Sequence, residues 1–267
     1  RKYLESTVVQ YVYFYRDLCQ IDIRNEIDWN EKKILLRAYF PVDIHTNEAT
    51  YEIQYGNVKR PTHYNTSWEQ AKFEVCAHKW IDISEDGYGV SVLNDCKYGC
   101  DIHNGVIGLT MLKSACYPNP DADKEQHEFS YSIVPHAEGW REAHTIQRAY
   151  AFNNPMKAIT KVNSSGYLAE EYSFVSTSRE NVIIESVKKA EKEDAVIVRM
   201  YEAFHRTTEV NVGFGPQIYK AYTCNLLEEN EMVLEIEKNT VTLTFRPYEI
   251  KSLKVFIEDC RTISSDY

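Results

Sequence analysis

The sequence predicts an all-β protein built from antiparallel sandwiches. Short stretches that alternate apolar and polar residues recur along the chain, and turn sequences such as "DWNEKK", "SEDGYG" and "HNG" separate most of them. Many strands at such short spacing are typical of sandwiched antiparallel sheets. The twenty tyrosines agree with this class because tyrosine favours strands, although it also lines sugar-binding surfaces.

The first part of the chain predicts a run of strands and two short helices. The strand segments are, in order, 6–15, 19–29, 32–44, 49–56, 72–84, 88–95, 105–112 and 127–136. Thr66, followed three residues later by Glu69, has the spacing of a helix capping box, which predicts one or two helical turns. Residues 141–155 predict a second short helix that ends before Pro155.

A stretch of small and polar residues predicts a boundary between two domains. We expect a large β-sandwich over residues 1–159, a linker over 160–171 and a smaller β-sandwich over 172–267. Strand-like segments resume at 174–178, 182–204, 209–214, 221–228, 232–245 and 250–258. The charged middle of "ENVIIESVKKAEKEDAVIVRMYEA" is interpreted as a hairpin tip between two strands, with a helix as the alternative.

The net charge and the cysteines limit the classes of function that this chain can have. The formal net charge of −10 argues against a nucleic-acid partner, because such surfaces need basic patches. No apolar run is long enough to cross a bilayer, and the N-terminal residues lack the features of a signal peptide, so no membrane partner is expected. Seven scattered cysteines show no disulfide framework, which predicts free thiols and a cytoplasmic location.

One cluster has a spacing that resembles half of a zinc site. Cys96 and Cys100 are four residues apart and His103 follows, but a second ligand pair has no candidate. We therefore expect no metal here, with Cys96 packed as a small buried residue and residues 103–105 closing a hairpin.

Two groups of carboxylates raise the question of a glycosidase pair. Asp82, Glu85 and Asp86 lie in "DISED", and Asp121 and Asp123 lie in "NPDADKE". Both segments have the composition of turns, and a catalytic acid needs burial to raise its pKa. We expect both groups to lie in solvated loops.

"KRPTHYNTSWEQAKFEV" places several polar and aromatic residues in one short connection. Such groups either hold a sugar by stacking and hydrogen bonding or cap a helix and fill a loop, and residue types alone favour the structural role.

Several long segments resemble the C-terminal region of glycoside hydrolase family 38 α-mannosidases of the cytosolic type. They are "IDWNEKKILLRAYFPVDI", "RPTHYNTSWEQAKFEVCAHKWIDISEDGYGVSVLNDCKYG", "GLTMLKSACYPNPDADKEQHEFSYSIVPH", "VIIESVKKAEKEDAVIVRMYEA" and "LTFRPYEIKSLKV". The resemblance implies a large sandwich of the mutarotase-like type followed by a smaller one. It also implies that the chain is a non-catalytic piece of a retaining enzyme that hydrolyses terminal α-D-mannosyl linkages.

The resemblance implies that the catalytic machinery lies elsewhere. In the family an aspartate nucleophile and a divalent metal, usually zinc, belong to an N-terminal domain that nothing in this sequence resembles. The expected partners are that catalytic domain and a mannoside substrate, and no cofactor is expected in this piece. Loops of this piece are expected to support the active site and to complete it.

The resemblance nominates substrate-side or interdomain residues, and no residue is nominated as catalytic. They come from the motif at 60–68, from the turn at 94–98 and from a segment where the family carries a basic residue, and they are Arg60, His63, Asn65, Trp68, Asn94, Asp95, Lys97, Tyr98 and Lys113. The alternatives are an autonomous carbohydrate-binding module and an assembly element that forms a homo-oligomer.

Overall fold

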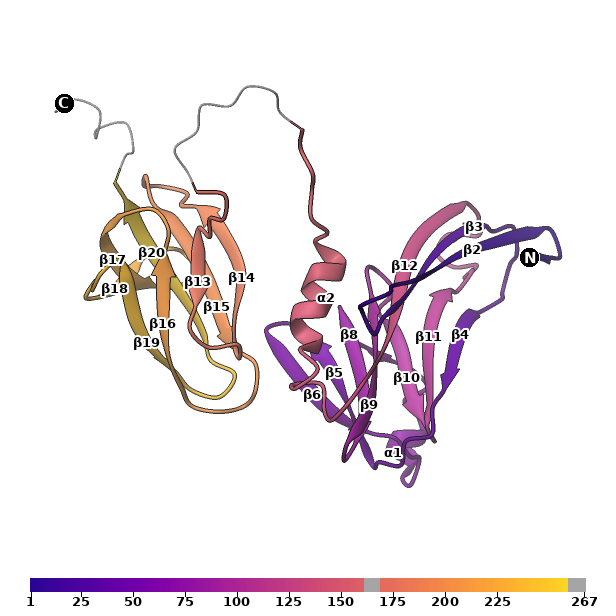
Figure 1. Ribbon diagram of the computed structural model, residues 1–267. Helices are drawn as coiled ribbons and strands as arrows, with labels where there is room; N and C mark the ends of the chain where they lie inside the picture. The colour runs from indigo at the N-terminus through magenta and orange to yellow at the C-terminus, as the bar shows by residue number, and fades with distance from the viewer. Residues whose placement is uncertain (161–168, 259–267) are drawn as a thin grey trace. The chain divides into compact units, whose positions relative to one another are not determined.

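The computed structural model describes residues 1–160 and 169–258, and it confirms an all-β protein (Figure 1). The chain divides into two compact units, Arg1–Ala158 and Ile159–Tyr267. Residues 161–168, which make up most of the predicted linker, lie outside the described residues. Each unit is described by itself below.

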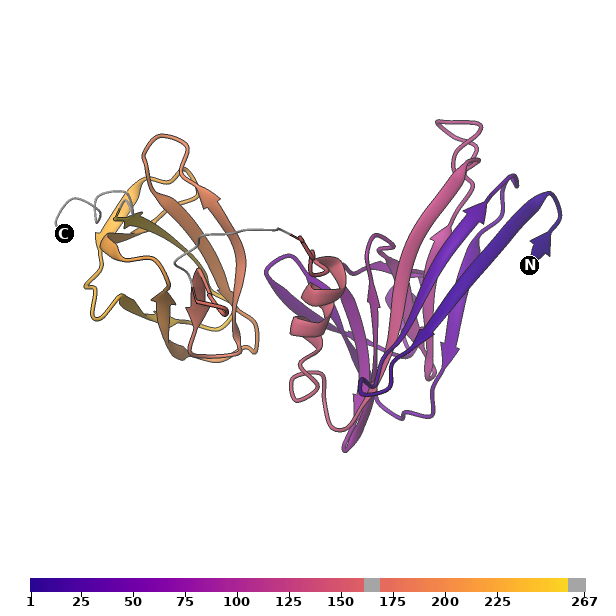
Figure 2. The same cartoon turned by 45° about the horizontal axis from the view of Figure 1, so that its top comes forward.

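The first unit is a sandwich of an eight-stranded and a four-stranded antiparallel sheet. The order in the large sheet is β1-β2-β3-β12-β9-β8-β5-β6, and the order in the small sheet is β4-β11-β10-β7 (Figures 1 and 2). The elements of this unit are β1 (Lys2–Tyr3), β2 (Ser6–Phe14), β3 (Ile21–Asp28), β4 (Leu36–Pro41), β5 (Glu48–Ile53), β6 (Gly56–Pro61), α1 (Ser67–Gln70), β7 (Val75–Cys76), β8 (Trp80–Glu85), β9 (Tyr88–Asn94), β10 (Gly99–His103), β11 (Val106–Leu112), β12 (Gln126–His136) and α2 (Thr145–Asn153).

The alternation of the sequence explains the core between these sheets. In β3, Ile23, Asn25 and Ile27 are buried while the residues between them are not, because successive side chains of a strand point to opposite faces. The facing sheet contributes Ile107 and Leu109 of β11 to the same core.

The other face of the large sheet is covered by α2, which packs on β8 and β9 (Figure 1). The rings of Trp80 and Trp140 lie 5.1 Å apart between their centroids, and Ile146 and Ala149 of α2 are buried. The helix predicted over 141–155 is therefore confirmed, and it ends at Asn153, before Pro155.

The structure corrects the strand prediction in two places. The segment 72–84 is not one strand: β7 belongs to the four-stranded sheet and β8 to the eight-stranded sheet, so the chain changes sheets over residues 77–79. Strands β6 and β10 were also missed, because their sequences "GNVKRP" and "GCDIH" carry too little apolar alternation.

Residues 103–105 close a hairpin as predicted. His103 pairs with Val106, and Asn104 and Gly105 have φ values of 47° and 71°. Two consecutive positive φ values define the two-residue turn whose twist matches that of the flanking strands, and the Asn-Gly pair favours this turn.

The second unit is a smaller sandwich of a three-stranded sheet, β13-β16-β19, and a five-stranded sheet, β14-β15-β20-β17-β18. Its strands are β13 (Val175–Thr177), β14 (Val182–Lys189), β15 (Val196–Glu202), β16 (Thr208–Phe214), β17 (Ile218–Cys224), β18 (Asn230–Val233), β19 (Thr240–Phe245) and β20 (Ile250–Ile257). Strands β14 and β15 pair antiparallel, which confirms the hairpin interpretation of the charged segment over its helical alternative. The predicted strand 232–245 is divided between the two sheets, as β18 and β19.

Candidate functional site

The two sequence motifs lie at opposite ends of strand β10. The turn at residues 94–98 leads into Gly99, the first residue of β10, whereas Tyr64 of the other motif stacks on His103, the last residue, with 3.7 Å between ring centroids. Five extended residues separate these ends, and the structure therefore does not join the motifs into one pocket.

Residues 113–125, which we call the Asp123 loop, lie at the same end of the sandwich as the 94–98 turn. They connect β11 to β12, and their conformation depends on Asp123. Its Oδ2 accepts hydrogen bonds from the backbone N–H groups of Lys113, at 3.0 Å, and Ser114, at 2.9 Å. One carboxylate thus orients the backbone from which the Lys113 side chain projects.

Neighbouring groups keep Asp123 ionised. Its partial burial opposes the charge, but the two backbone N–H groups, His127 and Lys97 outweigh that effect and hold the pKa of Asp123 below its ordinary value. Lys97 of the 94–98 turn thus contributes a favourable charge to the surroundings of Asp123.

Further contacts attach the Asp123 loop to the sandwich. The indole N–H of the buried Trp29 donates to Ser114 Oγ, and Lys33 N–H donates to the Ser114 carbonyl at 2.9 Å. At the far side of the loop, Lys32 Nζ lies 2.7 Å from Asp121 Oδ1. Asp121 thus lies exposed in the loop as expected, where it forms an ion pair, whereas Asp123 is partly buried in a hydrogen-bonded turn.

Asn94 is the buried centre of the neighbouring turn. Its Nδ2 donates to the His78 carbonyl at 2.6 Å, and its Oδ1 accepts from Lys97 N–H at 2.8 Å. The Asn94 carbonyl accepts from Asn153 Nδ2 at 3.0 Å, which ties the turn to α2. The polar groups of Asn94 are therefore used within the domain.

The other side chains of the turn differ in their exposure. Asp95 Oδ2 accepts from Ser130 N–H at 2.7 Å, and Lys97 Nζ lies 4.3 Å from the ring centroid of Phe129. Tyr98 is half exposed, with its ring edge-on to His78 at 5.1 Å. Lys113 is exposed, and the described residues provide no ion-pair partner for its ammonium group. Lys113 and Tyr98 are therefore exposed at this end, and hydrogen bonds of Asp123 and Asn94 hold the backbone that carries them.

The opposite end of the sandwich carries helix α1. Thr66 Oγ1 accepts from Glu69 N–H, and Glu69 Oε2 accepts from Thr66 N–H at 2.9 Å, which confirms the predicted capping box. His63 Nδ1 lies 3.5 Å from Glu69 Oε2, and the Arg60 guanidinium lies 4.6 Å above the ring of Tyr51. These residues stabilise the connection between β6 and α1.

Two nominated residues of this second motif project outward. Asn65 is exposed, and Trp68 is 81% exposed. Phe73, three residues after the helix, is exposed to a similar degree. Two exposed aromatic side chains in one short connection provide apolar surface suited to stacking against a sugar or packing against another domain.

The expectation of a solvated loop was wrong for Asp82. This residue lies in β8 and is buried, and its carboxylate accepts from Ser84 Oγ at 2.5 Å and Ser91 Oγ at 2.7 Å. Its Oδ2 lies 2.8 Å from Nε2 of His136 in β12. Residues 54 positions apart in the sequence make this contact, so no local pattern reveals it.

The Asp82, His136 and Ser91 cluster has the residue types of a serine hydrolase triad but not its geometry. Such a triad places the serine and the aspartate on different ring nitrogens of the histidine. Here Ser91 Oγ, at 3.2 Å, and Asp82 Oδ2 both meet Nε2, and the cluster is buried under Thr145 of α2. We therefore assign it to the attachment of α2.

The expected burial of Cys96 was wrong as well. Cys96 is exposed in the 94–98 turn, because the turn buries Asn94 in its place. Partial burial of the thiol group, together with the carboxylate of Asp95, raises the pKa of Cys96 to about 11. Cys100 is buried in β10 and His103 stacks on Tyr64, so the three candidate ligands face different surroundings.

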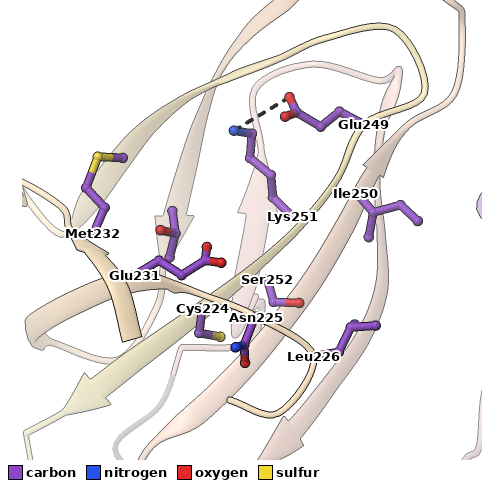
Figure 3. Close-up of a pocket in the computed structure, with 10 residues that line it drawn as sticks. Cys224, Asn225, Leu226, Glu231, Met232, Glu249, Ile250, Lys251 and Ser252 are labelled. Carbon is purple, nitrogen blue, oxygen red and sulfur yellow. Dashed lines mark ion pairs between the residues drawn. The ribbon is translucent and has the colours of Figure 1, made fainter. Parts of the chain in front are cut away.

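A hollow in the small sandwich was not anticipated from the sequence (Figure 3). Leu226, Met232 and Ile250 give it an apolar wall, and Lys251 Nζ lies 3.5 Å from Glu249 Oε2 (Figure 3). Cys224 and Ser252 also line the hollow, but burial raises the pKa of the Cys224 thiol, and Ser252 Oγ accepts a hydrogen bond from Arg199 Nε at 3.0 Å. Neither side chain is held as an activated nucleophile, so we assign no chemistry to this hollow.

Comparison with known protein families assigns both units. The model of the glycosyl hydrolases family 38 C-terminal domain matches residues 1–121, and the model of the family 38 C-terminal beta sandwich domain matches residues 181–253. The chain therefore belongs to glycosyl hydrolase family 38, as a C-terminal part of such a protein.

Individual relatives agree over most of the chain. It is 36% identical to alpha-mannosidase 2C1 of Homo sapiens over 89% of its own length and 23% of that protein. It is 37% identical to alpha-mannosidase G of Dictyostelium discoideum over 93% of its length and 23% of that protein. The chain thus spans less than a quarter of these relatives.

A solved structure confirms the fold. An alpha-mannosidase from Enterococcus faecalis V583 superimposes with a TM-score of 0.77 over 92% of this chain and 28% of that one, at 19% sequence identity.

Proposed function

We propose that this chain is the non-catalytic C-terminal part of a retaining alpha-mannosidase that hydrolyses terminal α-D-mannosyl linkages. The observation that carries the proposal is the similarity to proteins named alpha-mannosidases over about nine-tenths of the chain, at 36% and 37% identity. In this proposal the chain packs against an N-terminal catalytic domain and completes its active site.

The proposal places the nucleophile and the metal in the catalytic domain. Among residues 1–160 and 169–258, no group of three or more His, Cys, Asp or Glu residues could hold a metal ion. In this proposal zinc or another divalent cation is bound by residues of the catalytic domain, and no catalytic step is assigned to the residues described here.

The Asp123 loop supports a role in substrate contact. A lysine that contacts a sugar must be held in place without being neutralised, and Lys113 meets both conditions: Asp123 binds its backbone N–H at 3.0 Å, while its ammonium group is exposed. We propose that Lys113 faces the mannoside together with Lys97 and Tyr98 of the 94–98 turn. Trp68 and Asn65 then belong to a surface that packs against the catalytic domain.

A cytoplasmic location is part of the proposal. The six described cysteines are free, as expected in a reducing compartment. Over the described parts of the chain, the helices are too short or too polar to cross a bilayer.

The test compares two lysines of one loop in the longer protein. Lys113→Ala should lower kcat/KM for an aryl α-mannoside by about tenfold or more, as expected for the loss of a hydrogen bond from a charged group. Lys124→Ala removes an exposed lysine of the same loop and should change kcat/KM by less than about twofold. Equal effects of the two substitutions would show that Lys113 does not contact the substrate. An absence of mannosidase activity in the unmodified longer protein would refute the proposed function.

The exposed aromatic residues near α1 favour one other function, an autonomous carbohydrate-binding module. Calorimetry of the 267-residue chain with mannose and an α-linked mannobiose separates the two functions. Our proposal expects no affinity tighter than about 1 mM, which corresponds to roughly −4 kcal/mol. Tighter binding that is lost in Trp68→Ala would instead establish the module.

A further inference from the structure

The last residue of α2 binds the turn that the proposed function directs toward the mannoside. Asn153 Nδ2 donates to the Asn94 carbonyl at 3.0 Å and to the Ala149 carbonyl at 2.9 Å. Both acceptors are carbonyl oxygens, and the amide nitrogen of an asparagine carries two N–H groups, one for each acceptor. The side chain of Asn153 therefore uses both of its donors to connect the helix with the turn.

Helix α2 is well suited to hold the turn because it is itself attached to the large sheet. Its side chains Ile146 and Ala149 are buried against that sheet. At the start of the helix, Thr145 Oγ1 lies 2.9 Å from Ser91 Oγ of β9, the strand that ends at Asn94. Contacts along the whole helix thus fix Asn153 relative to β9.

The bond from α2 reaches Lys97 through Asn94. Asn94 Oδ1 accepts from Lys97 N–H at 2.8 Å, so the position of Asn94 determines that of the Lys97 backbone. The Tyr98 carbonyl instead accepts from Ala77 N–H at 3.0 Å, which gives Tyr98 an attachment that does not pass through Asn94. Loss of the bond from α2 should therefore displace Lys97 more than Tyr98.

We propose that Asn153 is a positioning residue for the mannosidase reaction. From the end of α2 it fixes the backbone at Asn94, and thereby it holds Lys97 in the orientation in which its ammonium group meets the mannoside. Asn153 does not touch the substrate and acts through Lys97. The inference rests on the proposed function, in which Lys97 faces the substrate.

The next residue, Asn154, provides a matched control. Its Nδ2 donates to the Tyr150 carbonyl at 3.1 Å, so Asn153 and Asn154 both bind the carbonyl four residues before them. Both lie at the carboxyl end of α2, where an added carboxylate is unfavourable in the same way. Asn153 binds Asn94 in addition, and a comparison of equal substitutions at the two positions isolates that contact.

The first experiment compares Asn153→Asp with Asn154→Asp in the longer protein. Both substitutions keep the shape of the side chain, but Asn153→Asp removes the donor and places a carboxylate oxygen against the Asn94 carbonyl. It should lower kcat/KM for an aryl α-mannoside about fivefold more than Asn154→Asp, as expected for the loss of one hydrogen bond. Equal effects of the two substitutions would overturn the inference.

A second set of variants shows whether Asn153 acts through Lys97. Lys97→Ala should itself lower kcat/KM, and adding Asn153→Asp to it should change kcat/KM by less than about twofold. In a Tyr98→Ala background, Asn153→Asp should keep its full effect, because Ala77 holds Tyr98 separately. Equal effects in both backgrounds would reveal a general structural role and overturn the inference, and so would an unchanged kcat/KM in Lys97→Ala.

Hydrogen–deuterium exchange of the longer protein tests the positioning independently of activity. The amide of Lys97 should exchange about tenfold faster in Asn153→Asp than in Asn154→Asp, since the turn opens more often without its bond to α2. The amide of Ala77 should exchange equally in the two variants. Equal exchange at Lys97 would overturn the inference.

Two further measurements keep these outcomes distinct. If Asn153→Asp fails to fold, Asn153→Ala and Asn154→Ala replace the pair, because they remove the same donors without adding a charge. An absence of mannosidase activity in the unsubstituted longer protein would refute the proposed function, whereas the exchange at Lys97 would still decide whether Asn153 fixes the turn.

Discussion

The two ends of the large sandwich use similar residue types in opposite ways. At the end with the 94–98 turn, Asn94 is 3% exposed and both polar atoms of its amide bind the backbone. At the end with α1, Trp68 is 81% exposed and projects from the surface. Both motifs are rich in polar and aromatic residues, so the difference shows that side-chain chemistry alone does not separate a structural turn from a surface available to a partner.

The strongest test of this comparison is Asn94→Ala. The substitution leaves the His78 carbonyl and the Lys97 N–H, which are partly buried, without their partner, and an unpaired group away from water costs about 1–3 kcal/mol. We expect a loss of roughly 2–4 kcal/mol in the free energy of unfolding.

Urea denaturation followed by tryptophan fluorescence measures this loss. Trp29, Trp68, Trp80 and Trp140 all lie in the first unit, so the signal reports on the large sandwich alone. Asn65→Ala removes an exposed asparagine at the other end and should change stability by less than about 0.5 kcal/mol. Equal effects of the two substitutions would erase the contrast between the ends.

A smaller effect is expected from Asp123→Asn, which keeps the side-chain shape and suits the positive φ of 61° at this position. The neutral amide still accepts hydrogen bonds from Lys113 and Ser114, but it loses the charge-assisted part, so we expect a loss of about 1–2 kcal/mol at pH 7.

The difference between wild type and Asp123→Asn should depend on pH. The folded pKa of Asp123 lies below its unfolded value, so the stabilising effect is complete above the unfolded pKa of about 3.9. It is lost as the pH falls through the folded pKa. The urea midpoints of both proteins should therefore keep their full gap at pH 7 and approach each other as the pH falls below about 3.9, and a gap that stays constant below that pH would exclude the charge as its source.

The smallest effects should come from the aromatic residues near α1. Tyr64→Ala removes a ring stacked on His103 and should cost about 1 kcal/mol. Trp68→Ala should change the free energy of unfolding by less than about 0.5 kcal/mol, since the side chain is largely in solvent. A larger loss from Trp68→Ala than from Tyr64→Ala, measured by urea denaturation, would place Trp68 in the fold rather than on an interaction surface.

Only part of the candidate site could be predicted from the sequence. Resemblance nominated Lys113, but the contacts that orient it come from Asp123, which composition assigned to a solvated loop. Asn94 and Trp68 were nominated together, although one is internal and the other external. Burial depends on which segments pack against a residue, and the residues that surround Asn94 come from positions as distant as His78 and Asn153.

The sequence by itself determined the local features of this protein. Alternation with a period of two produces strands such as β3, Asn104 and Gly105 produce a tight turn, and Thr66 with Glu69 caps α1, because each of these depends on residues a few positions apart. Only the tertiary structure decided that the segment 72–84 divides between two sheets and that Asp82 is buried against His136. These features depend on strands that are distant in the sequence. The assembled sheets determine which side chains are removed from water and which strands pair with each other.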